Sequence, residues 1–390
     1  MKAGWTDVAL SDVASINQRL INLPSDDALV SFVQMADLIA AKGRTTAGER
    51  RQFREVAKGY THFRRDDILV AKITPCFENG KIGRATIGTA LGAGSTEFHV
   101  VRPDPKRLDA AYALHFLRHS NVRRQGILRM TGSAGQRRVP GAFLQALSIP
   151  LPPLAEQRRI AQVLDAAHAL CEKRQSALSL LKGIIGSVFV SMFGDPVTNP
   201  REWPSKDLGS LGKLERGLST HRPRNAPELL GGPYPLIQTG DVARSEGLIT
   251  RYSSSYSDIG LGQSRLWPAG TLCITIAANI AKTGLLTFDA CFPDSVVGFT
   301  ADSVTTTYIQ AWLSFLQPTL ERSAPESAQK NINLAILRQL HVPTPPRQQQ
   351  AAFADTVELI RAAQRLHSNN LAQLEALFAS IRGRAFNGDL

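Results

Sequence analysis

Two loops in the first half of the sequence carry the residue types that hydrogen-bond to nucleic-acid bases and phosphates. They lie within KITPCFENGKIGR at positions 72–84 and within GSAGQRRV at positions 132–139. Arginine and lysine match the acceptors of guanine, asparagine and glutamine match adenine, and small hydroxyls join them on phosphate oxygens. We therefore predict DNA contact by the following side chains: Lys72, Thr74, Asn79, Lys81, Arg84, Gln136, Arg137 and Arg138.

The second half of the sequence contains counterparts of these loops. They are AANIAKTG at 277–284 and SAQKNIN at 327–333, and GLGQSRLW at 260–267 is a weaker candidate. The predicted DNA contacts in this half are Ser264, Arg265, Asn279, Lys282, Thr283, Gln329, Lys330 and Asn331. A further basic stretch, AKGRTTAGERRQFREVAKG at 41–59, is predicted to clamp the DNA backbone rather than to read bases.

The familiar catalytic motifs are absent from the sequence. AANIAKTG ends like a phosphate-binding loop, but it lacks the leading glycine and the glycine before Lys282. PDPK at 103–106 is only a turn-like version of a nuclease carboxylate–x–lysine pattern, and no Asn-Pro-Pro-aromatic sequence of an amino-methyltransferase is present. We therefore predict no catalytic residues and no cofactor in this chain.

Metal-ligand patterns are also missing. His115 and His119 stand four positions apart in YALHFLRHS, but no glutamate follows His115 as a metalloprotease helix requires. The four cysteines, at 76, 171, 273 and 291, form no CxxC pair. This spacing predicts neither a zinc site nor a disulfide framework, and a reducing compartment is the simplest expectation.

The charge of the chain is strongly basic and unevenly distributed. The formal net charge is +12 and the isoelectric point is about 9.8. Residues 1–148 hold 22 Lys and Arg against 13 Asp and Glu, a net charge of +9. This excess indicates a polyanionic partner for the first block, although a solvated basic face kept for solubility would have the same composition.

A proline-containing segment occurs at equivalent places in the two halves of the sequence. SIPLPPLAEQRRIAQVLDAA at 148–167 is matched by HVPTPPRQQQAAFADTVELI at 341–360, each a strand end, a proline pair and the start of a long helix. Trp5 and Trp203 open two similar amphipathic segments. The repeat predicts two equivalent halves, each a globular block followed by a helix. The predicted boundaries are 1–148, 149–198, 199–341 and 342–390.

Each predicted helix has an apolar seam with a period of 3.5 residues, which is typical of coiled coils. The first seam comprises Ile160, Leu164, Ala167, Cys171, Arg174, Leu178, Leu181, Ile185, Val188 and Met192. The second comprises Phe353, Val357, Ile360, Gln364, His367, Leu371, Leu374, Phe378, Ile381 and Ala385. The connectivity predicts antiparallel pairing, and hence an α+β fold. Two mixed α/β domains would be joined by a long antiparallel two-helix coiled coil, with a pseudo-two-fold internal repeat.

These features together resemble the specificity subunit of a type I restriction-modification system over nearly the whole chain. The resemblance is carried by IPLPPLAEQRRIA with its heptad helix ending in SMFGD, by DILVAKITP, NGKIG and STEFHVVRP, and by GSAGQRRV. The second copy departs from the pattern, because PTPPRQQQ replaces PLPPLAEQ and the equivalent of Glu156 is lost.

The resemblance implies that each block is a target-recognition domain for one half of a bipartite DNA site. The helices would fix the spacer and dock two methyltransferase subunits, which transfer a methyl group to adenine N6 with S-adenosylmethionine. A separate ATP-driven restriction subunit, with Mg²⁺, is a further partner that the resemblance allows. Contacts with partner subunits are expected on outward helix faces, at Gln157, Arg158, Arg159, Gln349 and Gln350.

Two other classes of function stay open at this point. One is a self-contained methyltransferase or nuclease with an unfamiliar site, and the other is a coiled-coil interaction scaffold without DNA binding. The apolar N-terminal core of a signal peptide is missing, and the uncharged run at 183–194 is too short to span a bilayer. We therefore expect a prokaryotic cytoplasmic protein that does not bind a membrane.

Overall fold

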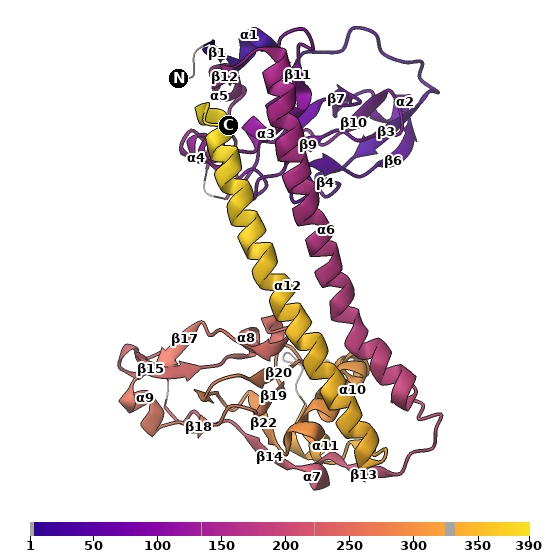
Figure 1. The fold of residues 1–390 in the computed structure, drawn as a ribbon, viewed down its shortest axis with the longest axis vertical. Helices are drawn as coiled ribbons and strands as arrows, with labels where there is room; N and C mark the ends of the chain where they lie inside the picture. The colour runs from indigo at the N-terminus through magenta and orange to yellow at the C-terminus, as the bar shows by residue number, and fades with distance from the viewer. Residues whose placement is uncertain (1–3, 134, 222, 324–331) are drawn as a thin grey trace. The chain divides into compact units, whose positions relative to one another are not determined.

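A computed structural model describes residues 4–133, 135–221, 223–323 and 332–390. The chain divides into two compact units (Figure 1). Unit 1 comprises Met1–Ser176 together with Ser368–Leu390, and unit 2 comprises Ala177–His367. Two long helices contribute to both units: α6 (Leu154–Phe193) and α12 (Arg347–Asn387).

Unit 1 contains two mixed β-sheets. Its six-stranded sheet has the order β2 (Ala14–Ile16), β11 (Phe98–Pro103), β8 (Ile68–Ala71), β9 (Ile82–Arg84), β5 (Arg44–Thr45) and β4 (Leu38–Ile39). Its four-stranded sheet has the order β6 (Glu49–Gln52), β3 (Leu29–Val33), β10 (Leu91–Gly94) and β7 (Thr61–Arg64). Strand β8 is buried at all four positions because its residues, ILVA, are apolar on both faces.

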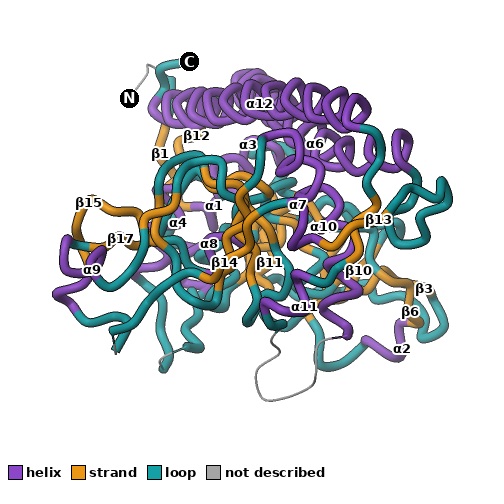
Figure 2. The backbone as a smooth tube through the Cα atoms, turned by 90° about the horizontal axis from the view of Figure 1, so that it is seen from below, coloured by secondary structure: helices purple, strands orange, loops and turns teal. Residues whose placement is uncertain are grey.

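Short helices and one further strand pair complete unit 1. The helices are α1 (Leu10–Val13), α2 (Phe53–Val56), α3 (Ala110–Leu117), α4 (Ser120–Leu128) and α5 (Gly141–Gln145). Strand β1 (Thr6–Ala9) pairs with β12 (Ser148–Leu151) in antiparallel register. Figures 1 and 2 both place this pair beside the C-terminal end of α12. The Arg159 side chain of α6 accordingly donates to the Leu390 carbonyl, at 3.0 Å.

Unit 2 repeats the two-sheet arrangement. Its five-stranded sheet has the order β14 (Lys213–Arg216), β22 (Val296–Thr300), β19 (Leu272–Thr275), β20 (Thr283–Leu286) and β16 (Gly247–Ile249). Its four-stranded sheet has the order β17 (Ser254–Tyr256), β15 (Leu230–Leu236), β21 (Ala290–Cys291) and β18 (Leu266–Trp267). The remaining elements are β13 (Ser205–Asp207), α7 (Leu208–Leu211), η1 (Pro227–Leu229), α8 (Thr239–Arg244), α9 (Asp258–Gly262), α10 (Ser303–Ser323), α11 (Leu334–Arg338) and β23 (His341–Pro343).

The predicted internal repeat is confirmed by equivalent contacts in the two units. The order β2-β11-β8-β9 in unit 1 matches β14-β22-β19-β20 in unit 2, and the β1–β12 pair matches β13–β23. The Tyr112 hydroxyl donates to the Pro150 carbonyl at 2.7 Å, and the Tyr308 hydroxyl donates to the Pro343 carbonyl at the same distance. Each tyrosine thus fastens a domain helix to the strand that leads into a long helix.

The two long helices pair in antiparallel fashion within each unit. In unit 1, Ile160 and Leu164 of α6 share a core with Ala385 of α12. In unit 2, Phe189 near the end of α6 packs on Phe353 near the start of α12, with ring centroids 5.5 Å apart. All residues of both predicted seams are buried or half-buried. The predicted α+β class with an antiparallel coiled coil is therefore confirmed.

A polar seam residue also makes a specific contact. The Gln364 amide nitrogen donates to the Leu181 carbonyl of α6, at 3.1 Å. This bond crosses the helix pair inside unit 2, at a position where the apolar pattern is interrupted. Polar seam residues commonly fix the register of paired helices, and Gln364 is placed to do so.

Helix α6 is a longer apolar segment than we expected from the sequence. Among the described residues it is the one helix that is long and apolar enough to cross a membrane by length and composition alone. The expectation counted only the uncharged run at 183–194, whereas the helix extends over 40 residues. Core helices of soluble proteins share this composition, and the seam of α6 supplies part of it.

The expected outward position of Gln157 is wrong. Its side chain is fully buried and makes three hydrogen bonds, because the entry of the chain into α6 leaves backbone groups that need partners. Its oxygen accepts from the Asp109 N–H at 2.8 Å, and its nitrogen donates to the carbonyls of Arg107 and Pro152 at 2.9 and 2.8 Å. The equivalent Gln350 is half-buried and donates to the Pro345 carbonyl at 2.8 Å.

We predict that Gln157→Ala destabilises unit 1 substantially. The substitution leaves one buried donor and two buried acceptors without partners, which costs about 2–3 kcal/mol and lowers the thermal midpoint by roughly 5–10 °C. Gln349→Ala, at a half-buried glutamine of the second copy, is the matched control and should leave the midpoint unchanged. Thermal unfolding followed by circular dichroism measures both, and equal midpoints for the two variants would contradict the prediction.

Candidate nucleic-acid interface

The two predicted DNA-contact loops of unit 1 lie against each other. The Thr74 N–H donates to the Arg137 carbonyl at 2.9 Å, and the Arg137 N–H donates to the Thr74 hydroxyl at 3.2 Å. The Thr74 hydroxyl in turn donates to the Gly135 carbonyl at 3.1 Å. Residues 72–81 and 135–138 therefore form one continuous surface, which we name loop surface 1.

Two arginines of loop surface 1 are held by carboxylates. Arg138 and Glu97 form a multiply hydrogen-bonded ion pair, with Nη2–Oε1 at 2.9 Å and Nε–Oε2 at 3.0 Å. Hydrogen bonding to Arg138 lowers the pKa of Glu97 below its usual range. Arg137 makes a single contact with Glu78 at 3.2 Å, and 44% of its side chain is exposed. Arg138 is thus fixed in position, whereas Arg137 is the more available cation.

The other predicted residues of unit 1 have differing environments. Asn79 is exposed at the tip of the loop. Lys72 is half-buried beside Glu97, and the Lys81 ammonium donates to the Met35 carbonyl at 2.7 Å. Arg84 lies on β9, where its guanidinium is 4.0 Å from the Asp66 carboxylate. Lys81 and Arg84 therefore have internal contacts, while Asn79 faces solvent.

The equivalent hairpin of unit 2 joins β19 to β20. The Thr275 hydroxyl is bonded to the Asn279 carbonyl, and the Lys282 N–H donates to the Thr275 hydroxyl at 3.1 Å. Ala278 and Ala281 adopt left-handed φ values of 63° and 56°, which fold the hairpin tightly. Lys282 is exposed by this turn, and Thr283 starts β20 in a half-buried position.

The same inter-loop contact occurs in both units. In unit 1 the Val139 N–H donates to the Lys72 carbonyl at 2.8 Å, and in unit 2 the Ile332 N–H donates to the Ile276 carbonyl at 3.0 Å. Each bond joins the segment before a short helix to the end of a central strand. The predicted contacts Gln329, Lys330 and Asn331 come directly before Ile332 and lie outside the described residues.

Ser264 and Arg265 directly precede β18, in the second sheet of unit 2. Arg265 pairs with Glu215 at 2.6 Å and lies over the Trp267 ring, 4.0 Å from its centroid. The Ser264 hydroxyl donates to the Leu218 carbonyl at 2.8 Å. Both side chains thus have local partners, and their contact with DNA stays a prediction.

The basic stretch at 41–59 presents exposed, loosely paired arginines. Arg54 pairs with Asp27 at 3.2 Å and Arg44 pairs with Glu172 at 3.5 Å, with 59% and 50% of the two arginine side chains exposed. Such pairs contribute little to stability and exchange readily with phosphate oxygens. Contact of this stretch with the DNA backbone stays a prediction.

Sequence reasoning missed the basic helix α4 as part of this region. A Cβ on Gly126 would lie 2.4 Å from the Phe77 ring, so α4 rests directly on loop surface 1. Arg123 reaches the same loop, because its Nη1 lies 3.0 Å from the place of a Cβ on Gly80. The run RRQGILR at 123–129 was the available signal, but its position beside the loop depends on tertiary packing.

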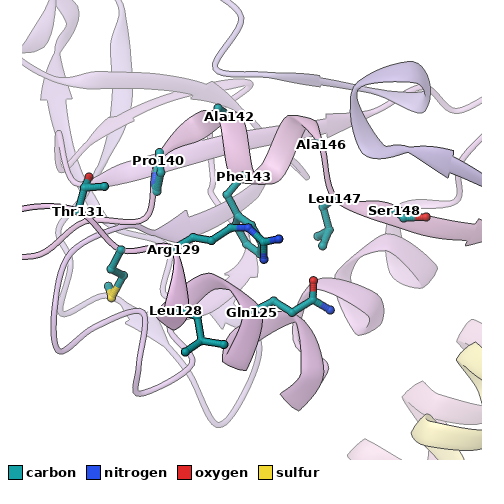
Figure 3. A pocket seen from close by; sticks show the side chains of 11 residues that line it. Gln125, Leu128, Arg129, Thr131, Pro140, Ala142, Phe143, Ala146, Leu147 and Ser148 are labelled. Atoms are coloured by element: carbon teal, nitrogen blue, oxygen red, sulfur yellow. The ribbon is translucent and has the colours of Figure 1, made fainter.

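A pocket of about 690 Å³ lies between α4 and α5 (Figure 3). Gln125 and Leu128 of α4 face Phe143 of α5 across it, and the Arg129 guanidinium lies 5.7 Å from the Phe143 ring centroid. The lining residues include no carboxylate, histidine or cysteine. Within the described ranges there is also no cluster of His, Cys, Asp and Glu that could hold a metal ion.

The fold is a duplicated α+β domain with lysine- and arginine-bearing loops at equivalent places in its two units. The family described as type I restriction modification DNA specificity domain matches residues 2–178 and again residues 200–376. The chain therefore belongs to this family and contains its domain twice.

Individual relatives agree with this membership. The chain is 40% identical over 181 residues to the type I restriction enzyme EcoEI specificity subunit of Escherichia coli, and 38% identical over 180 residues to the EcoAI specificity subunit. Each match covers 45% of this chain and 30% of the relative. A solved chain from work on complex assembly and conformational transition of the type I R-M system aligns over 100% of this chain and 99% of its own length, with a TM-score of 0.61. At 18% identity that likeness shows the fold.

We predict that the Glu97–Arg138 pair stabilises loop surface 1 only above acidic pH. Because the folded-state pKa of Glu97 is lowered, its stabilisation is complete above the unfolded value of about 4.3 and is lost as the pH falls through the folded value. Glu97→Gln should lower the thermal midpoint at pH 7, and its difference from wild type should shrink as the pH falls through the lowered pKa of Glu97.

Thermal midpoints and amide hydrogen exchange at Thr74 and Val139 measure this effect. Glu49→Gln is the control, because Glu49 is 64% exposed in its pair with Arg51. A difference between wild type and Glu97→Gln that does not shrink as the pH is lowered would rule out the ionic origin.

Proposed function

We propose that this chain is the specificity subunit of a type I restriction-modification complex. It binds duplex DNA, has no catalytic site of its own, and uses each unit to recognise one half of a bipartite target. The observation that carries the proposal is the duplication: the specificity domain is matched twice, and each unit presents the same loop after its central strand. Two equivalent domains suit two half-sites.

The charge distribution supports DNA as the ligand. Residues 1–148 carry a net charge of +9, and loop surface 1 presents Arg137 and Asn79 to solvent. Arginine and asparagine are the side chains that distinguish guanine and adenine in the major groove. We propose Thr74, Gln136 and Arg138 as their neighbours in this contact, with Lys72, Lys81 and Arg84 closer to the backbone.

The long helices are proposed to set the spacing of the half-sites and to bind partner subunits. Each helix is uninterrupted and contributes to both units, which suits a spacer element. Arg158 is the exposed candidate for partner contact, and Arg159 joins it although it pairs with Glu156 at 2.8 Å. Gln349 and Gln350 are half-buried candidates. Gln157 leaves this set because it is buried.

The partners are proposed to be two methyltransferase subunits and a restriction subunit. The methyltransferase subunits would bring S-adenosylmethionine for methyl transfer to adenine N6. The restriction subunit would bring ATP and Mg²⁺. The functional boundaries are proposed at 1–148, 149–198, 199–341 and 342–390, in a prokaryotic cytoplasm. Purified chain alone should transfer no methyl group and cut no DNA, which separates this proposal from a self-contained enzyme.

We predict that replacing residues 199–341 by the same domain of another family member changes one half of the methylated target only. Each unit has its own loops, so the half-site recognised by unit 1 should be retained. Co-expression with a cognate adenine methyltransferase, followed by genome-wide mapping of N6-methyladenine, measures the outcome. A change in both half-sites would contradict the division of recognition between units.

We also predict that Lys282→Ala weakens duplex binding through a lost phosphate or base contact. Lys282 is exposed at the tip of the unit 2 hairpin, and the slope of log affinity against log salt should fall by about 0.9. Lys206→Ala, at an exposed lysine of β13, is the matched control. Fluorescence anisotropy over a salt series measures both variants, and identical slopes would exclude Lys282 from the interface.

A further inference from the structure

The positive charge of the unit 2 block is concentrated where β14 ends. Residues 213–224, KLERGLSTHRPR, hold four Lys and Arg against one Glu. The whole block at 199–341 holds 13 against 12, which leaves nine against 11 in the rest of it. A basic stretch in an otherwise slightly acidic block is the pattern expected of a surface that meets a polyanion. Arg222, within this stretch, lies outside the described residues.

The end of β14 and the hairpin after β19 lie at the same end of the five-stranded sheet. Strand β22 runs between β14 and β19 and is antiparallel to both (Figure 1). On one side of β22, the Gly217 N–H donates to the Val296 carbonyl at 2.9 Å. On the other side, the Ile276 N–H donates to the Ser295 carbonyl at 3.0 Å. The two loops therefore leave the sheet on either side of the start of β22.

The spacing of these two loops suits one short stretch of DNA. Neighbouring strands of a sheet are about 4.8 Å apart, so loops that leave β14 and β19 are separated by roughly 10 Å. Each strand of duplex DNA rises about 3.4 Å per base pair. The separation therefore equals the length of roughly three base pairs, and both loops can contact one half-site.

The segment Arg216–His221, which we name the β14 exit segment, is held in a fixed conformation. The Leu218 N–H donates to the Phe292 carbonyl at 3.1 Å, and the Gln263 side-chain oxygen accepts from two further N–H groups of the segment, at 2.8 and 3.0 Å. A Cβ on Gly217 would lie 2.3 Å from the Phe292 carbonyl oxygen, so glycine is required for this close approach. A segment that is ordered in advance loses little conformational entropy on binding.

Arg216 is an exposed cation of the β14 exit segment. The adjacent carboxylate, Glu215, points to the opposite face of the strand, and it pairs with Lys213 at 3.1 Å and with Arg265 at 2.6 Å. Within the described residues, no carboxylate forms an ion pair with Arg216. Arg224, by contrast, is in an ion pair. Arg216 is therefore available to an anion without the loss of an existing partner.

We propose that the β14 exit segment is a further DNA-contacting segment of unit 2, with Arg216 on a backbone phosphate beside the bases that the hairpin contacts. This inference rests on the proposed function, which supplies the DNA. Guanidinium groups bind phosphate oxygens in charge-assisted hydrogen bonds, and a hydroxyl such as that of the exposed Thr220 joins such contacts. The segment adds affinity and fixes the position of the duplex, whereas the choice of sequence stays with base contacts.

The two units differ at the position of Arg216. Ile16 in β2 and Leu214 in β14 are equivalent, because each pairs with the same position of the neighbouring strand. Gln18 is therefore the counterpart of Arg216. The segment that follows β2, QRLINLPSDD at 18–27, holds one arginine against two aspartates. Unit 1 thus lacks the basic composition of unit 2 at this place, and the excess charge of its block comes from other segments.

Arg216→Gln is the decisive substitution, because it introduces the side chain that unit 1 has at the equivalent position. Arg216 is exposed, so the thermal midpoint should be unchanged. The affinity for a mixed-sequence duplex should fall about five- to tenfold near 0.1 M salt, and the slope of log affinity against log salt should fall by about 0.9. Arg216→Lys keeps the charge and should retain most of the slope.

Arg251→Gln is the matched control. Arg251 is also an exposed arginine of unit 2, and it follows the end of β16. Strand β16 is parallel to β20, and β20 starts at the hairpin. The end of β16 therefore lies at the opposite end of the sheet from Arg216. This variant should keep the wild-type slope.

Fluorescence anisotropy of the full chain with the duplex, at several salt concentrations, measures these variants. Arg216→Gln combined with Lys282→Ala should lower the slope by about 1.8, because the two contacts are separate. A wild-type slope in Arg216→Gln, or an equal loss in Arg251→Gln, overturns this inference. If Lys282→Ala alone still lowers the slope, the proposed function stands. Wild-type protein without salt-sensitive duplex binding overturns both.

Contact with another protein would give a different result. Normal duplex binding by Arg216→Gln, together with weaker binding to a methyltransferase subunit, would assign the segment to a protein interface and overturn the DNA contact.

Thr220→Glu tests the segment independently, should Arg216→Gln fail to fold. Thr220 is exposed, and its backbone N–H keeps the bond to Gln263 in the variant. A carboxylate at this place should repel the phosphates and weaken duplex binding. Normal affinity in a folded Thr220→Glu protein would count against the proposed contact.

Discussion

Burial of the two apolar seams is the constraint on which the rest of the structure depends. A helix as long as α6 exposes a continuous apolar stripe unless another helix covers it, and α12 carries the complementary stripe. Ile160 and Leu164 of α6 share a core with Ala385 of α12, and Phe189 of α6 shares a core with Phe353 of α12. The residues that cover each seam come from the other half of the sequence. Neither globular block therefore completes its core with its own residues alone.

This constraint leaves the exposed residues of the predicted DNA-contact loops outside the core, although Phe77 of loop surface 1 is fully buried in it. The core contains the central strands, such as β8 and β19. Tyr112 and Tyr308 attach domain helices to the proline-containing strands. Loop residues such as Asn79 and Lys282 then need only local hydrogen bonds to hold their shape. Their identities can vary without cost to the core.

Structural features that depend on local periodicity could be predicted from the sequence. Features that depend on tertiary contacts could not. The seams are read from spacing, and they are confirmed. Gln157 shows the limit, because a glutamine at a helix start has the same local pattern whether it faces water or satisfies buried backbone groups.

The discontinuous make-up of unit 1 has a consequence for its assembly on the ribosome. Unit 2 is encoded without interruption by Ala177–His367, whereas unit 1 requires Ser368–Leu390, which follows the whole of unit 2. Domains generally form as their residues emerge during translation. Unit 2 can therefore close first, and the faces of Ile160 and Leu164 that pack with Ala385 stay uncovered until Ser368–Leu390 has been synthesised. In the nascent chain, the basic block with its uncovered helix is the species most exposed to misassociation.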